Sequence, residues 1–120
     1  MEVLTINHDD LVITYNTIYA LIREGEKAIL ENNKRGDGTL TLLAAAYCAL
    51  DAVAEFCSDD DDEPEITCVD KEKAVKTITA LADDLRGRII IDTGVDYKIV
   101  QKVAALAFLR DYLSIKNNAL

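Results

Sequence analysis

Carboxylate side chains concentrated in one stretch are the feature of this sequence best suited to chemistry. Between Asp51 and Glu72 the chain carries ten acidic residues and one base, Lys71, which gives this acidic segment a net charge of −9. The other 98 residues carry 12 acids and 12 bases and are neutral. Carboxylates gathered in this way can bind a divalent cation or attract a basic partner. The candidate residues are Asp51, Glu55, Asp59, Asp60, Asp61, Asp62, Glu63 and Glu65.

Part of the acidic segment resembles a fragment of an EF-hand calcium loop. With Asp59 as the first position, acids stand at positions one, three and five, and Asp70 stands at the twelfth. Pro64 occupies the sixth position, where a calcium loop needs a positive φ that glycine supplies and proline cannot adopt. Asp70 is also shorter than the glutamate that ends such a loop. A solvated loop whose charge aids solubility is the simpler interpretation.

Magnesium is the second cation that the acidic segment suggests. Asp51 and Glu55 stand one helical turn apart, and Asp59 continues the stripe if the helix extends that far. Such clusters hold magnesium in all-helical nucleotide pyrophosphohydrolases, but the paired ExxE and ExxD motifs of those enzymes are missing here. Asp83 and Asp84 would add ligands only if the fold brought them close. A divalent-metal-dependent enzyme or cation-binding protein is therefore an alternative function.

Other catalytic and binding chemistries find little support. The three cysteines, Cys48, Cys57 and Cys68, form no CxxC motif, and an odd number argues against a secreted disulfide framework. His8 is the single histidine, which argues against paired-histidine metal sites and against a Cys–His nucleophile. The Gly36–Gly38 turn lacks the glycine pattern and lysine of a phosphate loop. A chain without a basic stripe and with a charge of −9 is not expected to bind nucleic acid.

The elements that must position these residues are predicted to be helices. Apolar residues at helical spacing predict helices over about 9–34, 39–57, from 70 to about 86, and 96–115. Asn7 and Asp70 are the expected caps of the first and third, and Gly36 is the expected stop of the first. The fold class is therefore all-α, a single domain over residues 1–120 built as a compact bundle of about four helices with short connections.

Two local features bear on this prediction. The run Ile89–Ile91 between two glycines also reads as a small strand over Arg88–Asp92, with residues 3–6 and 66–69 as possible neighbours, so an α+β fold is the alternative. Gly25 lies near the apolar face of the first helix and marks either a close helix crossing or a weak point. The second helix is expected to bury Leu43, Ala46, Tyr47, Leu50, Val53, Ala54 and Cys57.

Location and assembly follow from the same patterns. The longest uncharged run, Gly38–Leu50, has 13 residues, short of the roughly 20 that span a bilayer, so no membrane association and a cytoplasmic location are expected. The second helix also carries Ala44, Ala45, Cys48 and Ala52 away from its expected core face, and the last helix is apolar nearly all round. Exposed apolar surface of this extent usually marks an interface, so a homodimer is expected.

The function that these observations favour is a non-enzymatic interaction protein. Its acidic surface would bind and occlude a basic protein partner, in the manner of an inhibitor, an immunity protein or an anti-defence protein. No cofactor is expected, with Ca²⁺ or Mg²⁺ as the weaker possibility. A structural subunit that assembles with itself is the third alternative.

Overall fold

The computed structural model describes residues 6–56 and 69–118, with side chains described up to residue 115. Four helices and one small β-hairpin make up this part of the chain, which confirms the all-α prediction. The elements are α1 (His8–Asn32), α2 (Asp37–Phe56), α3 (Lys71–Arg86), β1 (Ile90–Ile91), β2 (Gly94–Val95) and α4 (Tyr97–Asn118).

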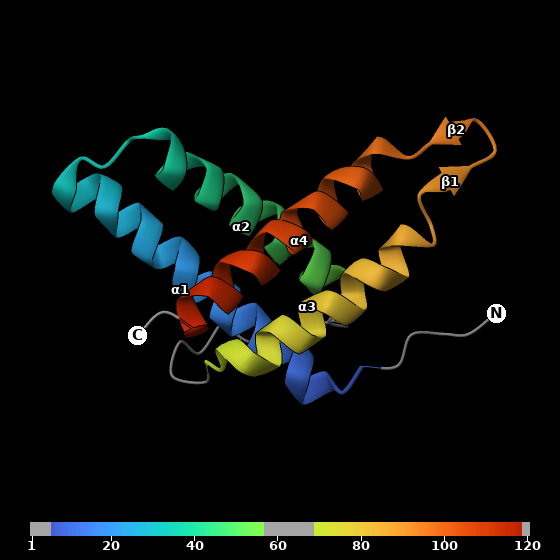
Figure 1. The fold of residues 1–120 in the computed structure, drawn as a ribbon, viewed down its shortest axis with the longest axis horizontal. Helices are drawn as coiled ribbons and strands as arrows, with labels where there is room; N and C mark the ends of the chain where they lie inside the picture. Colours follow the sequence, from blue (N-terminus) through green and yellow to red (C-terminus); the bar gives the residue numbers. More distant parts are fainter. Residues whose placement is uncertain (1–5, 57–68, 119–120) are drawn as a thin grey trace.

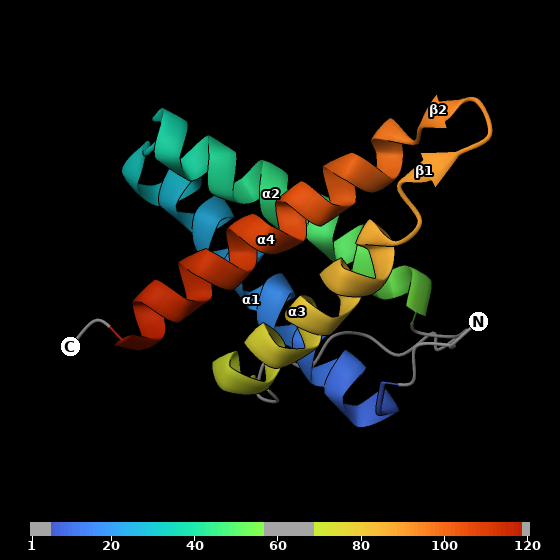
Figure 2. The ribbon, with the colours of Figure 1, turned by 45° about the vertical axis from the view of Figure 1, so that its right-hand side comes forward.

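The four helices form two helical hairpins that cross each other. Helices α1 and α2 form one hairpin, α3 and α4 form the other, and α4 lies across the first hairpin (Figure 1 and Figure 2). The hairpins meet where α2 packs against α4 and α1 packs against α3, so the order around the core is α1, α2, α4, α3. Helices that follow each other therefore lie side by side within a hairpin, whereas α2 and α3 share no major interface among the described residues. Helix α2 ends at Phe56 and α3 begins at Lys71, close to the predicted bounds of 57 and 70; residues 57–68 between them lie outside the described residues.

Local side-chain chemistry fixes both ends of α1. The Asn7 Oδ1 atom accepts a hydrogen bond of 2.7 Å from the backbone N–H of Asp9, as the predicted cap requires. The predicted stop at Gly36 is wrong, because the helix ends at Asn32 and Asn33 takes the left-handed conformation with φ 55°. Asparagine tolerates this conformation better than most residues, so it performs the role that glycine was expected to perform.

Aspartates begin the two helices of the second hairpin. The Asp70 side chain accepts a bond of 3.1 Å from the N–H of Lys73 and caps α3, as predicted. Asp96 Oδ1 accepts a bond of 3.0 Å from the N–H of Lys98 at the start of α4. A carboxylate at a helix start both satisfies a free N–H group and interacts favourably with the positive end of the helix dipole.

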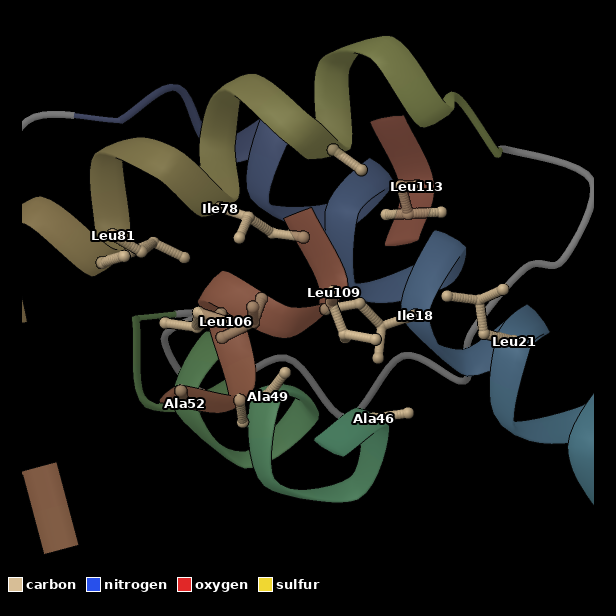
Figure 3. Packing of buried hydrophobic residues seen from close by; sticks show 14 of the residues in the cluster. Ile18, Leu21, Ala46, Ala49, Ala52, Ile78, Leu81, Leu106, Leu109 and Leu113 are labelled. Carbon is tan, nitrogen blue, oxygen red and sulfur yellow. The ribbon is translucent and has the colours of Figure 1, made fainter. Parts of the chain in front are cut away.

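The core lies between the two hairpins and uses one face of each helix (Figure 3). Helix α2 contributes mainly alanines, whereas α4 and α3 contribute leucine and isoleucine. Alanines let the neighbouring backbones approach closely, and the larger side chains opposite fill the space. The core residues drawn in Figure 3 include Ile18, Leu21, Ala46, Ala49, Ala52, Ile78, Leu81, Leu106, Leu109 and Leu113.

The predicted core face of α2 is partly wrong. Leu43, Ala46 and Val53 are buried as expected, but Tyr47 is 47% exposed and Ala54 is also exposed. Ala49 and Ala52 are fully buried instead, although Ala52 was expected on the opposite face. Cys57, the last residue of the predicted face, lies outside the described residues. The helix is thus rotated relative to the prediction.

Gly25 marks a close crossing of α1 and α2, one of the two roles predicted for it. A Cβ atom at this position would lie 2.8 Å from Leu43 Cδ2 and 3.0 Å from Leu43 Cγ. Carbon atoms in contact normally lie about 3.5–4.0 Å apart, so a larger residue at position 25 would require Leu43 to shift.

Polar side chains also lie in the core face of α1. Thr14, Asn16 and Thr17 are at most 2% exposed. The hydroxyl groups of Thr14 and Thr17 donate to the carbonyl groups four residues earlier, so their burial leaves no donor unsatisfied. Thr17 Oγ1 also accepts a bond of 3.2 Å from the N–H of Asp70, which ties the start of α3 to α1.

The predicted strand near Arg88–Asp92 exists only as one arm of a two-stranded antiparallel hairpin. Ile90 pairs with Val95 and Ile91 pairs with Gly94, which has φ 133°. Of the possible neighbours, residues 3–6 and 66–69, the structure describes only Ile6 and Val69, and neither pairs with this strand; the others lie outside the described residues. The hairpin projects from the body of the molecule between α3 and α4 (Figure 1).

Candidate interaction surface

The predicted acidic surface begins on the last part of α2. Asp51 and Glu55 are both exposed there, one turn apart, as their spacing predicted. The Glu55 carboxylate accepts a hydrogen bond from the ammonium group of Lys102 on α4, so part of its charge is neutralised within the molecule. Asp51 has no ion pair among the described residues and faces solvent.

The other predicted site residues, Asp59, Asp60, Asp61, Asp62, Glu63 and Glu65, lie outside the described residues. The structure does describe both ends of their connection. It leaves α2 at Phe56, and at the other end Asp70 is bound to Thr17 on α1. The Asp70 carboxylate caps α3, so the side chain at the twelfth position of the EF-hand-like pattern already has an intramolecular role.

The remaining carboxylates considered for metal binding have basic partners of their own. Arg86 donates a hydrogen bond of 2.7 Å to Asp83, and the Arg88 guanidinium forms an ion pair with the Asp84 carboxylate at 2.7 Å. The Arg88 guanidinium also lies over the ring of Phe56, 5.9 Å from its centroid. Within residues 6–56 and 69–115, no three His, Cys, Asp or Glu side chains gather closely enough to hold a metal ion. The described part of the chain therefore does not bring Asp83 or Asp84 into a cluster with Asp51 and Glu55.

Cys48 lies beside this surface on α2 and is partly buried. Burial and, to a smaller extent, the nearby Asp51 carboxylate raise the pKa of its thiol, while Lys102 acts in the opposite direction. A raised pKa keeps the thiol protonated near neutral pH, which makes it a poor nucleophile. His8 is exposed at the first residue of α1.

Helix α4 carries an exposed apolar face that its residue pattern indicated only in outline. We call it the α4 stripe and define it by the exposed residues Tyr97, Val100, Ala104, Phe108 and Ile115. Tyr97 is 67% exposed and Ile115 is 70% exposed. The prediction that α4 is apolar nearly all round gave no hint of which residues stay outside, because that requires knowing where α2 and α3 pack.

Helix α2 is also long and apolar enough to cross a membrane, judged by length and composition alone. Such a signal is weak for one helix, since core helices of water-soluble domains meet the same criteria. In this fold one face of α2 lines the core through Ala46, Ala49 and Val53.

Comparison of the chain with protein-family models, with curated proteins and with solved structures finds no match in any of the three.

Proposed function

We propose that this chain is a non-enzymatic interaction protein that uses its acidic segment to bind and occlude a basic protein partner. The observation that carries the proposal is the distribution of charge. All of the −9 net charge falls between Asp51 and Glu72, while the remainder of the chain is neutral. A concentrated field of one sign accelerates the encounter with a partner of opposite charge and disfavours partners of like charge.

The exposed side chains at the start of the acidic segment support this role. Asp51 and Glu55 face solvent on α2, and a helix presents charges to a partner with little loss of conformational entropy on binding. The thiol of Cys48 is protonated near neutral pH, which is consistent with a binding role more than with nucleophilic chemistry.

The test replaces Asp59, Asp60, Asp61 and Asp62 with asparagine. A matched control removes the same number of charges from exposed acids elsewhere, Glu24→Gln, Glu31→Gln, Asp37→Asn and Asp92→Asn. Wild-type protein and both variants are used to capture partners from a lysate of the source cells, and association rates with the captured partner are measured at two salt concentrations. Both variants have the same net charge, so the comparison separates a local surface from overall charge.

We expect the asparagine variant to bind a basic partner more slowly, with the difference shrinking as salt rises, because charges are screened beyond roughly 8 Å at physiological ionic strength. The control variant should retain most of the rate. Equal association rates for all three proteins at low salt would refute the proposal. Calorimetry with Ca²⁺ and Mg²⁺ tests the alternative, because a saturable heat that disappears in the asparagine variant would assign the segment to a cation.

A further inference from the structure

Helix α4 presents an apolar face that the bundle leaves partly exposed. At 100° per residue, Tyr97, Val100, Ala104, Phe108 and Ile115 fall within roughly 80° of the helix circumference, and the face is about 27 Å long. Helix α4 lies on the outside of the molecule, across the α1–α2 hairpin, in both views (Figure 1 and Figure 2). Its opposite face is in the core, through Leu106, Leu109 and Leu113 among others.

The composition of this face is that of an interface centre. Asp111 is the one charged residue within its angular range, in a chain of which 29% of residues are charged. Two of the five members of the stripe are aromatic, Tyr97 and Phe108. Interface centres are depleted in charge and enriched in aromatic residues compared with the rest of a protein surface.

The α4 stripe alone falls within the size range of the largest apolar patch on a monomer, and it exceeds that range only together with the adjoining β-hairpin. From the exposed fractions of its members, the α4 stripe presents on the order of 450 Å² of apolar surface. Ile90 and Val95 of the adjoining hairpin, 84% and 60% exposed, bring this to the order of 700 Å². The largest apolar patch of a monomer is about 300–600 Å², and a standard interface buries about 800 Å² on each partner.

The order of residues along the stripe is self-complementary. Ala104 and Phe108 stand two residues on either side of Leu106, so antiparallel packing places a small residue of one copy opposite a large ring of the other. Tyr97 and Ile115 stand nine residues on either side of the same centre and pair in the same way. A two-fold axis generates both pairs at once, as an isologous interface requires.

Few polar residues lie near the face. Gln101 and Asp111 fall on opposite sides of the line through Tyr97 and Ile115, and Asp111 is paired with Arg110 at 3.1 Å. An almost uncharged face gives no electrostatic selection for a basic or an acidic partner. A second copy of this chain is the partner that fits the face, because small and large side chains of the stripe then lie opposite each other.

We propose that the α4 stripe is a homodimer interface in which two copies of α4 pack antiparallel about a two-fold axis at the level of Leu106. This proposal is independent of the acidic segment, whose charge would remain available to another partner on each copy.

Analytical ultracentrifugation of the full chain tests the assembly. We expect the wild type to be dimeric at about 100 μM, and Ile115→Asp to raise the dimer dissociation constant at least tenfold. Ile115 is 70% exposed, so this variant should keep its fold, which circular dichroism and thermal melting check. Leu30→Asp is the matched control, because Leu30 is 83% exposed on α1 and lies outside the stripe. A monomeric wild type, or equal dissociation constants for the two variants, would overturn the proposal.

Disulfide trapping tests the antiparallel arrangement. Tyr97→Cys and Ile115→Cys proteins are mixed under mild oxidation, in a background in which Cys48, Cys57 and Cys68 are replaced by serine. Antiparallel packing brings position 97 of one copy next to position 115 of the other, so the mixed disulfide should dominate. Disulfides formed only within each variant, joining 97 to 97 and 115 to 115, would show parallel packing and overturn the arrangement.

Discussion

Replacing Gly25 with alanine tests the close crossing of α1 and α2. The added methyl group would lie 2.8 Å from Leu43 Cδ2, about 1 Å inside an ordinary carbon contact. Overpacking of a filled core costs about 1–3 kcal/mol, whereas glycine to alanine in a helix gains up to about 1 kcal/mol. We therefore expect Gly25→Ala to lower the free energy of unfolding by about 1 kcal/mol.

The sign of this effect should reverse when Leu43 is truncated. Leu43→Ala removes all three atoms that the new methyl group would meet, at a cost of about 2–4 kcal/mol for the cavity. In that background Gly25→Ala should stabilise the protein by about 0.5–1 kcal/mol, because only the helix-propensity gain and partial filling of the cavity remain. The coupling energy between the two positions should be about 2 kcal/mol.

Urea unfolding of the wild type, the two single variants and the double variant provides all four free energies. Equal m-values across the set would show that the denatured state is unchanged. If Gly25→Ala stabilises the wild type as much as it stabilises the Leu43→Ala protein, then Leu43 yields easily and the close approach does not require glycine.

Two further expectations concern single side chains. Cys48 should react with a thiol reagent only at a higher pH than the unfolded chain does, because burial and the Asp51 carboxylate raise the pKa of its thiol, and Asp51→Asn should lower that pH modestly. Labelling rates measured from pH 7 to 10 in a protein with Cys57→Ser and Cys68→Ser test this, and a pH profile equal to that of the unfolded chain would contradict it. Asp70→Ala should lower the free energy of unfolding by about 1 kcal/mol, because α3 loses its cap, whereas Glu72→Ala, an exposed control in the first turn, should lower it less. Thermal melting that ranked the two variants in the opposite order would show that the cap is not stabilising.

The features that sequence predicted well depend on local chemistry. Asn7 and Asp70 cap their helices because a short polar side chain reaches an N–H two or three residues ahead, whatever the tertiary fold. The presence of Asp51 and Glu55 on one exposed side of α2 belongs to the same class, because it follows from helical spacing.

The rotation of α2 was not predictable from its own residues. The helix is so rich in alanine that several faces look equally apolar, so hydrophobic periodicity carries little information about which one turns inward. Its orientation depends on two tertiary contacts, the close approach of Leu43 to Gly25 on α1 and the packing of α2 against α4. These contacts leave Tyr47 exposed, and its hydroxyl donates a hydrogen bond of 2.9 Å to the Glu26 carboxylate at the surface.

The burial of polar residues on α1 was not predictable from the hydrophobic pattern, for a different reason. Thr14 and Thr17 count as polar in any hydrophobic pattern, yet their hydroxyl groups bond to the backbone of their own helix and leave methyl groups to pack. The pairing of Glu55 with Lys102 likewise joins residues 47 positions apart, which spacing along the chain does not reveal. Within the described residues, the sequence predicted which helix carries the candidate site, but it did not predict which residues of other helices contact that site.

The crossing of two hairpins has a consequence for the order of folding. Each hairpin joins helices that are neighbours in sequence, so its contacts close short loops and need little chain entropy. The contacts between α1 and α3 and between α2 and α4 form only when the two halves dock, and the bond from Asp70 to Thr17, 53 residues apart, belongs to that later step. We therefore expect each helical hairpin to form locally and the docking of the two hairpins to limit the rate of folding.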